Sequence, residues 1–218
     1  MTAIRVLIVD DDPLVRSGLK MMLGGEESIR IVGETSDGSG VPAAVDAHRP
    51  DVVLMDIRMP EVDGLTATRR LRERTSPPAV IVLTTFDADE MVFSALRHGA
   101  AGFLLKDTPP AEILRAIKLV ASGDAVLSPT VTRQLLDHFS GGEKGDEVDR
   151  ASKSVAGLTD REREVAAAVG RGCSNQEIAD ELFMSVSTVK AHVTKLLSKL
   201  DADNRVQIAL IVRDAGLT

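Results

Sequence analysis

The sequence predicts a five-stranded, doubly wound α/β domain with a parallel sheet, followed by a small all-α domain. Two patterns support this prediction. Residues 1–123 alternate short β-branched apolar runs with longer amphipathic segments, as in a parallel sheet that is buried on both faces. Residues 157–218 lose the strand pattern and read as helices. A chain of 218 residues has room for one or two domains.

Five apolar runs of residues 1–123 have the composition of buried strands. They are Ile4–Val9, Ile29–Gly33, Val52–Met55, Val80–Leu83 and Gly102–Leu105. Helices are expected between and after them, for example at Leu14–Leu23, Gly64–Arg74, Asp89–His98 and Pro110–Ala121. Binding sites of such sheets form where the strands end, at their carboxyl edge. The polar residues that follow each strand are therefore the first candidates for function.

Residues 124–156 are predicted to be a linker with a short helix. Pro129–Phe139 has the pattern of a short amphipathic helix, and the polar stretch after it is rich in Gly and Ser. That composition is typical of a flexible connection between domains.

Residues 157–218 are predicted to form four helices. Thr159 with Glu162, and Ser174 with Glu177, match the capping box that begins a helix. The helices after the second are expected at Val186–Leu200 and Asn204–Ala215. The first of these has apolar residues at spacings of three and four, which predict one face packed on the domain core: Val189, Val193, Leu196, Leu197 and Leu200.

Composition favours a cytoplasmic protein without a membrane partner. No apolar run approaches the ~20 residues of a membrane helix, and the single cysteine, Cys173, suits the cytosol. The net charge of −7 weighs against nucleic-acid binding. Between Ser187 and Leu200, however, there are three lysines and no acid, so the overall charge does not decide the question.

Charged and hydroxyl side chains follow four of the five predicted strands. Asp10 and Asp11 follow the first, Asp56 the third, Thr84 the fourth and Lys106 the fifth. Three carboxylates at one sheet edge repel unless a cation lies between them, and oxygen ligands suit Mg²⁺. A carboxylate beside such an ion can attack a phosphoryl group. A single aspartate at a strand end is more often a helix cap, but the whole set in this strand context predicts a phosphate site.

The segments IVDDDP, VVLMDIRMPEVDG, VIVLTTFD and GAAGFLLKD resemble the signature segments of the receiver domain of two-component response regulators. The resemblance implies a flavodoxin-like fold in which Asp56 accepts a phosphoryl group from a sensor histidine kinase. Mg²⁺ would be held by Asp10, Asp11, Asp56 and the backbone carbonyl of Arg58. Thr84 and Lys106 would contact the phosphoryl group.

The resemblance also implies a conformational switch, in which Thr84 moves toward the phosphate and Phe103 turns inward. Two positions depart from the pattern. Phe103 replaces the tyrosine of many receivers, and Asp12 stands where this subfamily often has histidine. Neither departure removes a residue that the phosphoryl transfer requires.

From Leu158 the sequence closely resembles the LuxR-type helix-turn-helix of NarL/FixJ-type response regulators. The resemblance implies that Gln176–Leu182 is the supporting helix, Val186–Leu200 the recognition helix and Asn204–Ala215 a dimerisation helix. The residues implied to contact DNA are Thr188, Lys190, Ala191, Thr194, Lys195 and Lys199. Among them, Lys190 and Ala191 would approach bases, and Lys195 and Lys199 phosphates.

These expectations describe a phosphorylation-dependent transcriptional regulator that forms a homodimer on activation and binds double-stranded promoter DNA. The main alternative is a regulator that works without phosphorylation and uses its receiver for dimerisation. Such receivers usually lose an acid or the lysine, whereas this chain keeps them. An aspartate-based phosphohydrolase would need a second acid two residues after Asp56, where this chain has Arg58. We therefore expect no enzyme, apart from slow self-dephosphorylation. Signalling through protein contacts alone is disfavoured by the cationic helix around Lys190.

Overall fold

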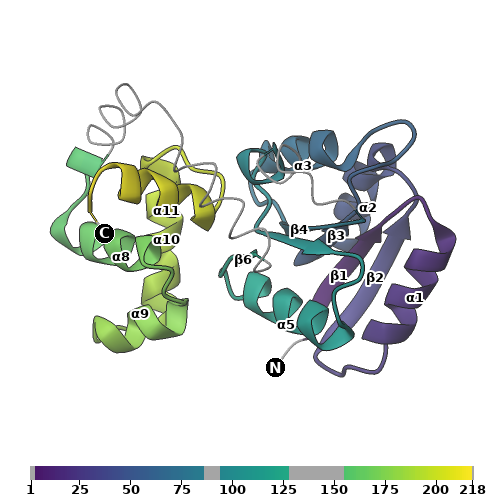
Figure 1. Cartoon of the computed structure of the whole chain (residues 1–218), viewed down its shortest axis with the longest axis horizontal. Helices are drawn as coiled ribbons and strands as arrows, with labels where there is room; N and C mark the ends of the chain where they lie inside the picture. The colour runs from purple at the N-terminus through teal and green to yellow at the C-terminus, as the bar shows by residue number, and fades with distance from the viewer. Residues whose placement is uncertain (1–2, 86–93, 128–154, 218) are drawn as a thin grey trace. The chain divides into compact units, whose positions relative to one another are not determined.

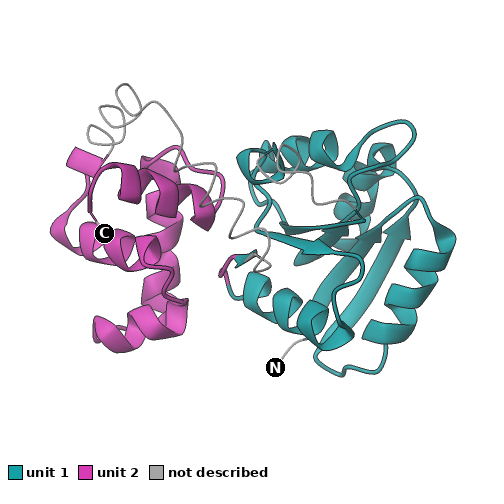
Figure 2. Ribbon diagram, in the orientation of Figure 1, with its two compact units in different colours: residues 1–122, 126–135 teal, residues 123–125, 136–218 magenta. Residues whose placement is uncertain are grey.

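The computed structural model describes residues 3–85, 94–127 and 155–217. The chain divides into two compact units, which we describe separately (Figure 2). The first comprises residues 1–122 and 126–135, and the second residues 123–125 and 136–218. The predicted helix at Pro129–Phe139, most of the predicted linker and the first half of the predicted helix Asp89–His98 lie outside the described residues.

The first unit contains a parallel sheet whose strands have the order β2-β1-β3-β4-β5-β6 (Figure 1). The five predicted strands are β1 (Ile4–Val9), β2 (Ile29–Thr35), β3 (Val52–Met55), β4 (Ala79–Thr84) and β5 (Gly102–Leu105). A two-residue strand that we did not predict, β6 (Val126–Leu127), pairs with β5 at the edge of the sheet. All pairs are parallel, so the carboxyl ends of the strands share one edge.

Helices cover both faces of this sheet, which confirms the doubly wound prediction (Figure 1). Alternate strand residues face opposite sides. On one side they pack against α1 (Pro13–Leu23) and α5 (Pro110–Ala121). On the other side they pack against α2 (Val41–His48) and α3 (Gly64–Arg72), which ends two residues before its predicted boundary. A short 3₁₀ helix, η1 (Gly38–Gly40), precedes α2.

The second unit contains four helices among its described residues. They are α8 (Asp160–Gly170), α9 (Asn175–Glu181), α10 (Val186–Lys199) and α11 (Arg205–Asp214). Both predicted capping boxes are present, at Thr159 with Glu162 and at Ser174 with Glu177. The expected core face of α10 is also present, because Val189, Val193, Leu196 and Leu200 are buried and Leu197 packs against the same cluster.

In the part of the chain that the structure describes, none of the helices is long and apolar enough to cross a membrane.

Candidate functional site

Three aspartates meet at the carboxyl edge of the sheet. Asp10 and Asp11 follow β1, and Asp56 follows β3, the strand beside it. Each offers a carboxylate oxygen within 4.8 Å of the others. Asp10 and Asp56 are only 2% and 5% exposed, whereas Asp11 is exposed. Three carboxylate oxygens this close together, one of them on an exposed residue, suit the coordination of Mg²⁺.

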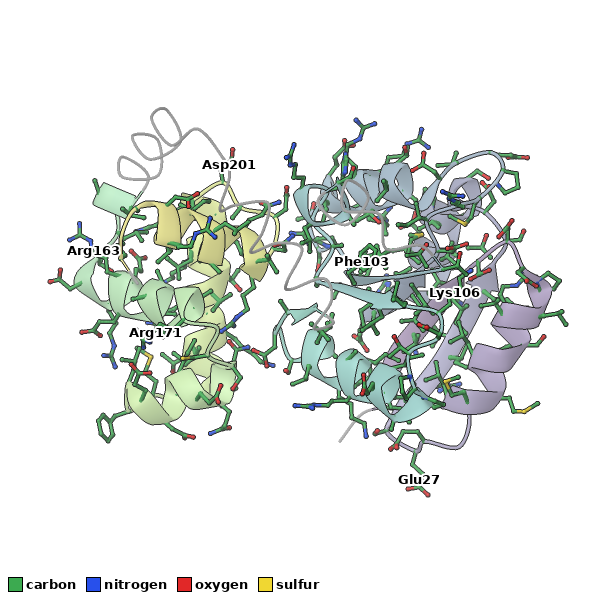
Figure 3. The ribbon with its side chains drawn as sticks, in the orientation of Figure 1. Glu27, Phe103, Lys106, Arg163, Arg171 and Asp201 are labelled. Atoms are coloured by element: carbon green, nitrogen blue, oxygen red, sulfur yellow. The ribbon has the colours of Figure 1, made fainter. Side chains whose placement is uncertain are left out.

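Lys106 forms ion pairs with two of these acids. Its Nζ lies 2.7 Å from Asp10 Oδ2 and 3.1 Å from Asp56 Oδ2. The lysine follows β5, and its backbone N–H donates to the carbonyl of Thr84, which fixes its place beside β4 (Figure 3). Burial alone would lower the pKa of Lys106, but its hydrogen bonds to Asp10 and Asp56 outweigh this and raise it. The cluster therefore has a permanent ammonium within reach of the phosphoacceptor candidate.

Burial has the opposite consequence for Asp56. Removal of the carboxylate from water raises its pKa, although Lys106 and the backbone N–H of Ile57 oppose this shift. The ionised form of Asp56 is thus destabilised by its surroundings. A buried carboxylate whose pKa is raised, and which lies beside other acids, is typical of a functional site.

Thr84 and Phe103 lie on adjacent strands near this cluster. Thr84 ends β4 and is buried, and it pairs in register with Leu105. Phe103 lies in β5 with none of its surface exposed (Figure 3). The ring of Phe103 is thus buried in the structure, and the predicted inward turn of this ring remains a prediction. Arg58 is exposed in the loop after Asp56.

The loop after Asp56 depends on a glycine that the sequence motif contains. Gly64 N donates to the carbonyl of Ile57, which closes the loop at 2.9 Å. A Cβ at position 64 would lie 1.9 Å from the carbonyl oxygen of Asp56. No side chain can occupy that space, so glycine is required where the loop returns to Asp56.

Two further residues hold the loops of the site, and neither stands out in the sequence. Asp37 accepts hydrogen bonds from the backbone N–H groups of Ser39, Glu61 and Val62 at 2.7, 3.0 and 3.2 Å. These bonds lower the pKa of Asp37 to about 2 and tie the loop after β2 to the loop after Asp56. Arg16 contacts the loop that carries Asp10 and Asp11. The only sequence signal for Asp37 is an Asp-Gly pair, which marks a turn.

Asp12, the acid that departs from the subfamily pattern, has a structural task. Its carboxylate accepts from the backbone N–H of Leu14 at 2.8 Å and caps the start of α1. Its own N–H donates to Asp10 Oδ1 at 3.0 Å. This bond orients one of the candidate ligands.

In the second unit, α10 presents a polar, cationic surface opposite its buried face. The predicted DNA-contacting residues are all exposed on it: Thr188, Lys190, Ala191, Thr194, Lys195 and Lys199. Ser185 caps the helix by accepting from the N–H of Thr188 at 3.1 Å. The Thr194 hydroxyl donates to the carbonyl of Lys190 in the preceding turn. Small side chains between lysines leave room for close approach to a DNA groove.

Lys199 differs from the other two lysines of this surface. Its Nζ donates to Glu162 Oε2 at 2.7 Å and links α10 to the buried start of α8. This hydrogen bond and the one from the Thr159 N–H lower the pKa of Glu162 to about 2. Lys199 therefore forms an ion pair within its own domain, and a contact with a DNA phosphate would compete with this pair.

Comparison with known families assigns each unit separately. Residues 6–118 match the response regulator receiver domain. Residues 156–212 match the bacterial regulatory proteins of the luxR family.

Relatives that match over nearly the whole length of this chain are transcriptional regulatory proteins. The chain is 40% identical to the transcriptional regulatory protein LiaR of Bacillus subtilis (strain 168), over 95% of each chain. It is 35% identical to the transcriptional regulatory protein YxjL of the same organism, over 98% of this chain and 97% of the relative. Among solved structures, the response regulator ChrA of a heme-sensing two-component system matches all of both chains with 35% identity and a TM-score of 0.55.

Proposed function

Because the chain belongs to the two-component response regulators with a receiver domain and a LuxR-type DNA-binding domain, we propose that phosphorylation of Asp56 controls its binding to promoter DNA. Transcriptional regulation is the function of this family, and the family is not one of enzymes. The proposal concerns the chemistry of Asp56, the residues that assist it and the way in which the signal reaches α10.

The observation that carries the proposal is the cluster of Asp10, Asp11 and Asp56 with Lys106 at 2.7 and 3.1 Å from two of them. An Asp56 carboxylate oxygen attacks the phosphorus of a phosphohistidine on the sensor kinase. The new P–O bond forms as the P–N bond breaks, and the histidine leaves with the bond's electron pair and takes up a proton. Asp56 becomes an aspartyl phosphate.

The charges of the site suit this step. Bound Mg²⁺, held by the three aspartates and the Arg58 carbonyl, would supply positive charge for the phosphoryl oxygens. Lys106 exchanges its ion pair with Asp56 for one with the phosphate. The Thr84 hydroxyl moves toward the phosphate and donates a hydrogen bond to one of its oxygens. This movement of Thr84, together with the buried ring of Phe103, alters the surface around β5. Slow hydrolysis of the aspartyl phosphate would return the protein to its resting state.

The output is DNA binding by two copies of the helix-turn-helix unit. Lys190 and Ala191 approach base edges, and Thr188, Thr194 and Lys195 line the same exposed surface of α10. With few cationic contacts in each copy, a single unit binds DNA weakly and with strong salt dependence. Dimerisation places two recognition helices on adjacent half-sites and raises affinity through effective concentration. Because the protein is proposed to act on promoter DNA and to receive its phosphoryl group from a sensor kinase, we expect it to act in the cytoplasm.

The test is the molar mass by light scattering, with and without Mg²⁺ and beryllium fluoride, a mimic of phosphorylated aspartate. We expect a monomer that becomes a dimer in the wild type and stays a monomer in Asp56→Asn. Promoter binding measured under the same conditions should increase only in the wild type, and Lys190→Ala should dimerise normally without binding DNA.

The alternative is a regulator that acts without phosphorylation and uses the receiver to dimerise. It predicts a dimer, and equal DNA binding, in the wild type and Asp56→Asn without beryllium fluoride. That result would overturn phosphorylation control and leave the DNA-binding assignment intact.

A further inference from the structure

We propose that Arg16 is a positioning residue for the Mg²⁺ site, because its guanidinium holds the loop from which Asp10 and Asp11 project. The proposal rests on the proposed function, since it assigns a task in the phosphoacceptor site to a residue that contacts only backbone atoms of that site. Arg16 acts on the shape of the loop and not on the phosphoryl group.

The loop between β1 and α1 is short and carries two candidate ligands in succession. β1 ends at Val9 and α1 begins at Pro13, so the carbonyls of Asp10 and Asp11 follow the strand and precede the helix. Backbone carbonyls in such a position need donors from elsewhere. Arg16 Nη1 lies 2.7 Å from the Asp10 carbonyl oxygen and 3.2 Å from that of Asp11. One guanidinium nitrogen thus joins two consecutive peptide groups.

The guanidinium is itself held from the neighbouring strand. Its Nε lies 3.7 Å from Oε2 of Glu34 in β2, and the side chain of Arg16 is only 17% exposed. Lys20 Nζ lies 2.9 Å from the same Glu34 oxygen but is more exposed, at 43%. Arg16 therefore connects β2, through Glu34, to the loop of the acids. Lys20 shares the Glu34 carboxylate but, among the described residues, makes no hydrogen bond to that loop.

This connection matters because the acids repel one another. Asp10, Asp11 and Asp56 have carboxylate oxygens within 4.8 Å of one another, and the single charge of Lys106 is paired with Asp10 and Asp56. Asp11 is exposed, so an unrestrained loop would relieve the repulsion by turning Asp11 away. A loop held by its carbonyls keeps Asp11 in place, and the ion then binds without first ordering its ligand.

The positive charge of Arg16 has the opposite influence on Mg²⁺. A nearby cation repels the ion, so loss of the charge alone would strengthen Mg²⁺ binding. Loss of the two hydrogen bonds would weaken it. The sign of the change in Mg²⁺ affinity upon substitution therefore distinguishes a positioning residue from a mere neighbouring charge.

The experiment compares Arg16→Gln with Lys20→Gln in the full chain. Both substitutions remove one positive charge and one partner of Glu34, but only the first removes the bonds to the loop. Mg²⁺ dissociation constants are measured by heteronuclear NMR titration. We expect Arg16→Gln to bind Mg²⁺ about tenfold more weakly, as for other residues that orient metal ligands, and Lys20→Gln to bind it as well as the wild type or slightly better. In metal-free protein, order parameters of the amides of residues 11 and 12 should fall only in Arg16→Gln.

Unchanged or tighter Mg²⁺ binding by Arg16→Gln would overturn the proposal, and so would an equal loss in Lys20→Gln. Arg16→Lys provides a second test if Arg16→Gln does not fold. It keeps the charge and the pairing with Glu34 but not the guanidinium donor that reaches both carbonyls, so we expect an intermediate affinity, and wild-type affinity would overturn the claim that the guanidinium holds the loop. A wild type that binds Mg²⁺ but is not modified at Asp56 would refute the proposed function and leave the role of Arg16 standing. A wild type without Mg²⁺ affinity would refute both.

Discussion

Substitution of Lys106 by methionine should destabilise the metal-free receiver unit by about 3 kcal/mol. The change removes the ammonium that lies 2.7 Å from Asp10 and 3.1 Å from Asp56, in a cluster whose side chains are 14%, 2% and 7% exposed. Each contact corresponds to a gross attraction of ~5–6 kcal/mol at an effective dielectric constant of about 20. Desolvation offsets much of this attraction, and removal of one partner of a buried pair costs about 3–5 kcal/mol.

Protonation of Asp10 or Asp56 sets an upper limit on the loss of stability in Lys106→Met. Once the lysine is gone, one of the two acids can take up a proton, and this costs ~4 kcal/mol at neutral pH for a carboxyl of ordinary pKa. The partial exposure of Lys106 favours the lower end of the range. Added Mg²⁺ should reduce the deficit, because the ion binds the folded state and replaces the missing positive charge.

The assay is urea unfolding in the presence of a chelator, followed by hydrogen–deuterium exchange in peptides from β3 and β5. Exchange reports on the receiver unit separately from the helical unit. Lys118→Met is the matched control, because Lys118 pairs with Glu26 at 3.5 Å and has a side chain that is 46% exposed. An exposed pair of this kind contributes about 0–1 kcal/mol. A deficit in Lys106→Met no larger than that of the control would refute the reasoning.

Four further predictions concern the loops of the acid cluster and helix α10. Asp37, whose pKa is lowered to about 2 by backbone N–H donors, stabilises the fold fully above its unfolded pKa of 3.8, and this contribution is lost as the pH falls through the folded pKa. Urea midpoints of the wild type and Asp37→Asn should therefore differ at neutral pH and converge in acid; a constant difference would contradict this. Lys195→Ala should reduce the salt dependence of promoter binding by about one unit of log–log slope for each copy bound, which is about two units for the dimer. Lys199→Ala should leave that slope unchanged and lower thermal stability instead, because its partner is a buried glutamate of α8; a reduced slope would show that this lysine reaches DNA. Gly64→Ala should lower stability by about 3 kcal/mol in urea, since its Cβ would overlap the backbone carbonyl of Asp56. Gly18→Ala, on the open face of α1, is the control and should be neutral or stabilising.

Much of the architecture follows from local patterns in the sequence. The strand runs, the capping boxes and the apolar face of α10 each depend on residues a few positions apart, whose relation is set by the backbone geometry of one element. The site followed with one added rule, that parallel strands bring their carboxyl ends to one edge. That rule placed Asp10, Asp56 and Lys106 together, although they are far apart in the chain. The two-residue strand β6 was missed because it is too short to produce a pattern.

The sequence by itself thus determined the fold class, the acid cluster with its lysine and the polar face of α10. Only the tertiary structure decided which charges are committed to other partners. The sequence predicted that Lys199 contacts a DNA phosphate, but in the fold Glu162 of α8 lies 2.7 Å from its Nζ. The sequence assigned no role to Asp37, which in the fold accepts hydrogen bonds from the loop after Asp56. The physical reason is that periodicity and capping are properties of one segment. The pairing of a long charged side chain, in contrast, depends on which distant backbone or carboxylate the fold places within about 3 Å of its end.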